Sequence, residues 1–85
     1  MENSELLDQL KEIIVRVTGL TVEEIGDDDH FDDDLGLDSL SMLEVWVEID
    51  REFKESAVKI PNEELSEIFT LGGAVSRIQL ELAKA

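Results

Sequence analysis

Cysteine is absent from this chain of 85 residues. No disulfide can support the fold, and no side-chain thiol can carry a thioester. Basic residues are scarce as well, since 7 lysines and arginines stand against 22 aspartates and glutamates, for a formal net charge of −15. This balance argues against nucleic-acid binding, because phosphate contacts require clustered basic side chains. It favours partners with basic surfaces, unless the charge serves only to maintain solubility.

Long apolar runs are also lacking. No run approaches the roughly 20 residues that a membrane-spanning helix requires. The acidic stretch 1–5 has neither the basic start nor the apolar run of a signal peptide. We therefore expect a cytoplasmic protein with no membrane span. The apolar fraction of 42% is enough to form a core, and the length allows a single domain over residues 1–85.

The spacing of the apolar residues that are present predicts four helices. They cover about Ser4–Thr18, Ser39–Phe53, Asn62–Phe69 and residues 71–82. No stretch alternates with a period of two for long enough to predict a strand. We expect an all-α fold, a four-helix bundle with a short third helix. The predicted end residues are Ser4 and Gly19 as caps of the first helix, Asp38 as N-cap of the second, Pro61 as the first residue of the third and Thr70 as N-cap of the fourth.

The three long helices each contribute one apolar face to the predicted core. The inward-facing residues are Leu6, Leu10, Ile13, Ile14 and Val17 in the first helix, Met42, Val45, Trp46, Ile49 and Phe53 in the second, and Leu71, Val75, Ile78 and Leu82 in the last. Gly72 and Gly73 stand in the first turn of the last helix. They indicate a close approach of another backbone at that point.

A long acidic connection joins the first two predicted helices. It contains nine carboxylates from Glu23 through Asp38 and no lysine or arginine. The capping-box pattern at 21–24 predicts one short helical turn there. We expect Phe31, Leu35 and Leu37 to anchor the connection onto the core. Connections of this length in a compact domain are often functional.

The second predicted helix has another apolar stripe besides its core face. Leu40 and Val47, seven residues apart, fall on one side together with Glu44 and Arg51. One interpretation is that Leu40 and Val47 are ordinary surface residues, because scattered apolar residues are common on protein surfaces. The other reading is a face on which a partner docks.

Residues 34–40 read Asp-Leu-Gly-Leu-Asp-Ser-Leu and place Ser39 where the acidic connection meets the second helix. A serine in the first turn of a helix lies beside unpaired backbone N–H groups and the positive end of the helix dipole. That position favours a phosphodiester. Asp38 and Ser39 could also be a simple capping pair. The stretch resembles the attachment motif of acyl carrier proteins, Asp-x-Gly-x-Asp-Ser-Leu, and meets every fixed position of it.

The resemblance to acyl carrier proteins covers nearly the whole chain and implies both fold and function. The family fold is a four-helix bundle with a short third helix. In the family, a phosphopantetheinyl transferase uses magnesium and coenzyme A to place 4′-phosphopantetheine on the motif serine, which matches Ser39. Asp38 matches the preceding acid that the transferase recognises, and Leu40 lies beside the attachment point. The resemblance implies a carrier and not an enzyme.

The resemblance also implies partners and the residues that meet them. Leu40, Glu44, Val47 and Asp50 match partner-facing positions of the second helix. The partners would be acyl-transferring and acyl-modifying enzymes of fatty-acid, polyketide or related biosynthesis, with basic docking patches, and the carrier a free-standing monomer. Ser41 and Arg51 replace acids usual in the fatty-acid type, and the loop between Phe53 and Pro61 is about three residues longer. These departures indicate a dedicated carrier.

Three alternatives remain at this point. A peptidyl or D-alanyl carrier is one, although the residues around Ser39 and the strong negative charge favour an acyl carrier. A divalent-cation-binding interaction module is another, although neither register of the aspartate runs at 27–29 and 32–34 fits an EF-hand loop. The third is a serine hydrolase. The single histidine, His30, lies inside the acidic connection, and the chain has no Gly-x-Ser-x-Gly elbow.

Overall fold

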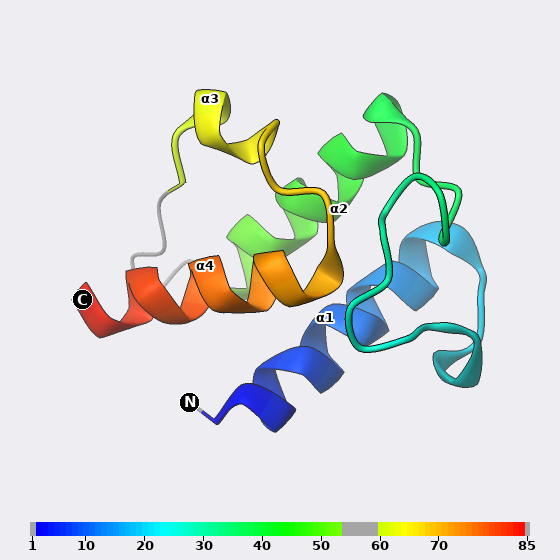
Figure 1. The fold of residues 1–85 in the computed structure, drawn as a ribbon, viewed down its shortest axis with the longest axis horizontal. Coiled ribbons are helices and arrows are strands. Elements are labelled where there is room, and N and C mark those ends of the chain that lie inside the picture. The colour runs from blue at the N-terminus through cyan, green and yellow to red at the C-terminus, as the bar shows by residue number, and fades with distance from the viewer. Residues whose placement is uncertain (1, 54–59, 85) are drawn as a thin grey trace.

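The computed structural model describes residues 2–53 and 60–84, and these ranges contain helices but no strand. The elements are α1 (Asn3–Thr18), the 3₁₀ turn η1 (Val22–Glu24), α2 (Ser39–Glu52), α3 (Asn62–Leu65) and α4 (Leu71–Lys84). Three long helices pack together, while the short α3 lies above α4 and beside α2 (Figure 1). The expected all-α bundle with a short third helix is confirmed. Most of the loop between Phe53 and Pro61 lies outside the described residues.

The core forms where the apolar faces of α1, α2 and α4 meet. The helical residues that are buried are Leu6, Leu10, Ile13, Ile14, Val45, Ile49, Leu71, Ala74, Val75 and Ile78. They recur every three or four positions along each helix, so one stripe of each helix is removed from water. Val17 and Leu82, also expected to face inward, are only partly buried. No polar or charged side chain is fully buried among the described residues.

Of the two predicted caps of α1, only the C-terminal one is confirmed. Gly19 has φ of 81° and donates its N–H to the Val15 carbonyl at 2.8 Å, which confirms the predicted C-terminal cap. The prediction of Ser4 as N-cap is wrong. The Leu6 N–H already bonds to the Glu2 carbonyl at 3.0 Å, so Glu2 is the N-cap and Ser4 lies in the first turn.

The third helix is shorter than predicted. It ends at Leu65 instead of Phe69, and Pro61 is its N-cap and not its first residue. The Phe69 carbonyl accepts the N–H of Phe31 at 2.8 Å, which draws the chain after α3 toward the acidic connection and out of helical geometry. Thr70 then caps α4 as predicted, because its hydroxyl accepts the Gly73 N–H at 3.0 Å. The last helix continues two residues past the predicted end at Leu82.

Gly72 does lie at a close approach, but to a side chain. Its N–H donates to the Asp28 carboxylate at 3.1 Å, so an acid from the connection caps the start of α4. A Cβ at Gly72 would clash with this same carboxylate. The expectation of a neighbouring backbone was therefore wrong.

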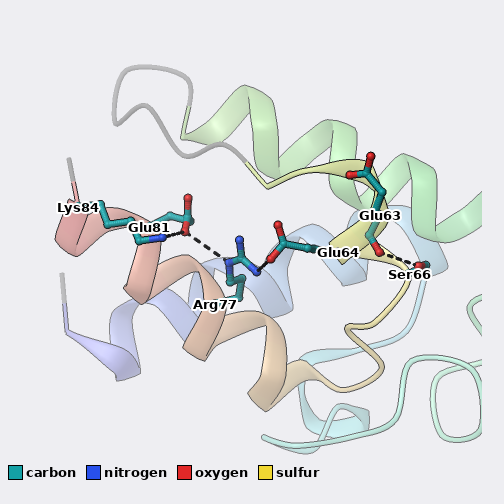
Figure 2. Close-up of polar contacts among 6 residues, drawn as sticks. All are labelled: Glu63, Glu64, Ser66, Arg77, Glu81 and Lys84. Carbon is teal, nitrogen blue, oxygen red and sulfur yellow. Dashed lines mark hydrogen bonds and ion pairs between the residues drawn. The ribbon is translucent and has the colours of Figure 1, made fainter.

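Arg77 ties α3 to α4. Figure 2 shows its guanidinium between Glu64 of α3, at 2.5 Å, and Glu81 of its own helix, at 3.4 Å. The hydrogen bond with Arg77 lowers the pKa of Glu64 below its ordinary value. The sequence alone gives no sign of this ion pair, because it does not show which helix lies opposite Glu64.

We expect the Glu64–Arg77 pair to steady α3 in a pH-dependent way. Because the folded-state pKa of Glu64 is lowered, the stabilisation is complete above its ordinary pKa of 4.5 and is lost as the pH falls through the folded value. Arg77→Gln should speed hydrogen exchange of the Glu64 and Leu65 amides at neutral pH, with little effect on the global melting temperature.

The matched control for this test is Arg51→Gln. It breaks an ion pair with Glu48 inside α2 and leaves α3 untouched. Exchange in α3 that responds equally to the two substitutions, or to neither, would contradict the assignment.

Candidate functional site

Ser39 begins α2 and is exposed to solvent. Its hydroxyl has no hydrogen-bond partner among the described residues, while the carboxylate of Asp38 accepts the Ser41 N–H at 2.8 Å. The predicted N-cap is thus confirmed, and the cap is Asp38 rather than Ser39. The serine oxygen is left free beside the positive end of the helix.

Asp38 is a carboxylate at neutral pH. The backbone N–H of Ser41 is the largest of several hydrogen bonds that lower the pKa of Asp38 below its ordinary value. The side chain therefore presents a fixed negative charge immediately before the serine.

The turn before Ser39 is held by buried leucines on both sides of a glycine. Leu35 and Leu37 are buried, and the Leu37 N–H donates to the Phe31 carbonyl at 2.8 Å. Gly36 between them has φ of +68°, and a Cβ there would meet no atom within 4 Å. Glycine is thus required by the backbone conformation and not by lack of space. The anchoring predicted for Phe31, Leu35 and Leu37 is confirmed.

The first acid of the motif has a structural task. The Asp34 carboxylate accepts the His30 N–H at 2.8 Å and closes the turn that leads to Ser39. The Nδ1 atom of His30 in turn accepts the backbone N–H groups of Asp32 at 3.2 Å and Asp33 at 3.1 Å. His30 thus takes part in the hydrogen bonds that hold the acidic connection in its conformation.

Other carboxylates of the connection are also engaged locally. Asp27 pairs with Lys11 at 2.6 Å, and Asp29 accepts the Gly26 N–H at 2.7 Å. The capping-box glutamate of η1, Glu24, accepts the Thr21 N–H at 3.0 Å, as predicted. Across residues 2–53 and 60–84 no three acids or histidines are grouped so that they could hold one metal ion.

An apolar groove of about 730 Å³ opens at Ser39, between α2 and the segment 65–69. We call it the proximal groove. Its walls include Met42, Leu43 and Trp46 from α2 and Leu65, Ile68 and Phe69 from the opposite segment, with His30 and Phe31 at the end near the connection. The rings of His30 and Phe69 stack with centroids 6.2 Å apart.

Met42 and Trp46 are only partly buried, which corrects their assignment to the core. Val45, Ile49 and Phe53 from the same predicted face are buried as expected. The difference arises because α1 covers one part of the apolar face of α2. The part that faces α3 borders the groove instead.

The second apolar stripe of α2 is exposed. Leu40 is 67% exposed and Val47 is 56% exposed, and Glu44 and Asp50 lie on the same side. Leu43, at 59% exposed, joins this stripe, and its spacing of three and four residues from Leu40 and Val47 could have revealed it. We call these five residues the docking face.

Acidic side chains on the docking face and beside it differ in whether a cation neutralises them. Glu48, beside the docking face, lies 3.1 Å from Arg51 and 3.9 Å from Arg16. Glu44 and Asp50 pair with no cation among the described residues. Their charges are therefore available to a basic partner.

Comparisons with known proteins agree with this arrangement. The family model described as a phosphopantetheine attachment site matches residues 8–78. An acyl carrier protein of Renibacterium salmoninarum is 42% identical over 76 residues, which cover 89% of this chain and 90% of the relative. The meromycolate extension acyl carrier protein of Mycolicibacterium aurum is 41% identical over 75 residues, 88% of this chain and 74% of the relative.

A solved structure of the acyl carrier protein of Enterococcus faecalis matches with a TM-score of 0.73 and 30% identity, over 95% of this chain and 99% of the other. The chain belongs to the acyl carrier protein family. As an acyl carrier protein it is not an enzyme, and its cofactor is a covalently bound phosphopantetheine. The carrier role implies interaction with biosynthetic enzymes. No helix in the described part of the chain is long and apolar enough to cross a membrane.

Proposed function

We propose that Ser39 is the attachment site of 4′-phosphopantetheine, and that the chain is a single-domain, free-standing carrier which delivers acyl intermediates to biosynthetic enzymes. The observation that carries the proposal is the free Ser39 hydroxyl at the start of α2, which also borders the proximal groove. The family match over residues 8–78 spans this serine and supports the assignment.

The residues around Ser39 fit a phosphodiester. The positive end of the α2 dipole stabilises negative charge at this position, while the Ser41 N–H is already bonded to the Asp38 carboxylate. Phosphopantetheine supplies the terminal thiol that the chain lacks, and acyl groups are held on that thiol as thioesters. Asp38 marks the site for the transferase, and the apolar walls of the groove give an acyl chain a place away from water.

Incubation with coenzyme A, Mg²⁺ and a broad phosphopantetheinyl transferase tests the proposal. Intact mass should rise by one phosphopantetheine, or the sample should already carry it. Loading with acyl, aminoacyl and D-alanyl donors then separates an acyl carrier from the other carrier types. Absence of any gain, from a demonstrably unmodified sample, would contradict the assignment.

We also propose a cytoplasmic carrier dedicated to one lipid or polyketide pathway. The surface of α2 beside its docking face differs from that of the common fatty-acid type, because Ser41 and Arg51 stand where acids are usual. Arg51 also neutralises Glu48, at 3.1 Å. Equal turnover when this chain replaces the general carrier in fatty-acid elongation would weaken the proposal.

Glu44→Lys should slow transfer to partner enzymes by roughly tenfold, the low end of the effect of electrostatic steering. The substitution reverses one of the unpaired charges of the docking face, so encounter with a basic patch becomes slower and less dependent on salt. Glu67→Lys makes the same change in charge at an exposed position outside the docking face and should leave the rates near those of the parent. Unchanged kinetics with several partners for Glu44→Lys would remove Glu44 from the interface.

A further inference from the structure

A second hollow adjoins the proximal groove further along α2, toward the C-terminal end of the helix and away from Ser39. This distal groove has a volume of about 290 Å³, and Val47, Ile49, Asp50 and Ile60 are among its walls. The two grooves share three residues, Leu43 and Trp46 from α2 and Leu65 from α3. The two hollows therefore adjoin at these three residues.

Trp46 is the main residue at this junction. It carries the largest side chain of the three and is half-buried, whereas Leu43 is 59% exposed and turned largely to solvent. Leu65 approaches from the opposite wall, on the helix that the Glu64–Arg77 pair ties to α4 (Figure 2). Trp46 lies seven residues after Ser39, roughly 10 Å along the helix axis.

We infer that Trp46, with Leu65, is a partition that limits how much of an acyl chain the carrier shelters. The inference rests on attachment at Ser39, because a chain tethered there enters the proximal groove first. It fills that groove until its end meets the indole. To go further it must displace Trp46, so longer chains leave their excess length in solvent.

The partition sets the dependence of thioester protection on chain length. Each methylene that enters the groove should slow hydrolysis by up to about fourfold, if hydrolysis requires the chain to leave the groove first. Protection should stop rising at the length that fills the proximal groove. Trp46→Ala joins the two hollows, so protection should continue to rise over additional methylenes before it levels off.

The experiment uses the full chain loaded with saturated acyl groups of increasing length, and intact mass confirms each loading. The rate of non-enzymatic thioester hydrolysis is measured for the parent, Trp46→Ala, Leu65→Ala and Leu80→Ala. Leu80 is 52% exposed on α4 and lines neither groove, so Leu80→Ala should level off at the same length as the parent. Trp46→Ala and Leu65→Ala should both level off at longer chains.

Leu65→Ala keeps the experiment decisive if Trp46→Ala fails to fold, and it retains the only tryptophan as a reporter. Emission of Trp46 in the parent should shift to shorter wavelength as the chain lengthens, and stop shifting where protection levels off. The partition is overturned if thioester protection levels off at the same acyl chain length in the loaded parent, Trp46→Ala and Leu65→Ala. It is also overturned if the emission of Trp46 stays constant while protection in the parent rises. Failure to load at all would instead contradict attachment at Ser39, which separates the two claims.

Discussion

Replacing Ser39 with alanine should abolish attachment of phosphopantetheine. The substitution removes the only oxygen that the side chain offers, while the cap of α2 stays in place because it comes from Asp38. Ser39 is exposed and its hydroxyl makes no hydrogen bond among the described residues, so the free energy of unfolding should change little, by about 0.5 kcal/mol or less. Loss of modification would then reflect chemistry and not unfolding.

Ser41→Ala is the matched control for that result. Ser41 lies two residues further along α2 and contributes its backbone N–H to Asp38, which alanine retains. Mass spectrometry after incubation with coenzyme A and transferase should show full modification of Ser41→Ala and none of Ser39→Ala. Modification of both variants, or of neither, would be incompatible with Ser39 as the attachment site.

The second large effect concerns stability. Ile78→Ala should lower the free energy of unfolding by about 2–5 kcal/mol, because it leaves a cavity at a fully buried position of α4. That is a large part of the total for a small domain, which is about 5–15 kcal/mol in general. Urea unfolding monitored by circular dichroism measures the change.

Leu80→Ala is the control on the same helix. Leu80 is 52% exposed, so its truncation should cost about 0.5 kcal/mol or less. Similar losses for Ile78→Ala and Leu80→Ala would mean that the core is not where α1, α2 and α4 meet.

The features predicted well from sequence are those set by neighbouring residues. Apolar spacing located the three long helices, and short-range capping chemistry located Gly19, Asp38 and Thr70. The motif pointed to Ser39 because the turn that presents it is built from residues within ten positions of it. Such features depend on local geometry that a sequence records directly.

The features missed are those set by distant residues. The contact between Asp28 and Gly72 spans 44 positions, and the pairing of Phe31 with Phe69 ends α3 early. Periodicity places Trp46 on the apolar face of α2 but does not say that the opposite element is a short helix that leaves a groove. The grooves and the partition between them therefore required the structure.

Fragmentation of peptides from the acyl-loaded carrier locates the acyl-phosphopantetheine on the chain and tests the central claim most directly. Acyl-coenzyme A and a transferase load the full chain, and tandem mass spectrometry then assigns the added mass to a residue. We expect the whole acyl-phosphopantetheine mass on Ser39 in a single loaded species. The same mass on any other residue, or an acyl group attached without phosphopantetheine, would contradict the account.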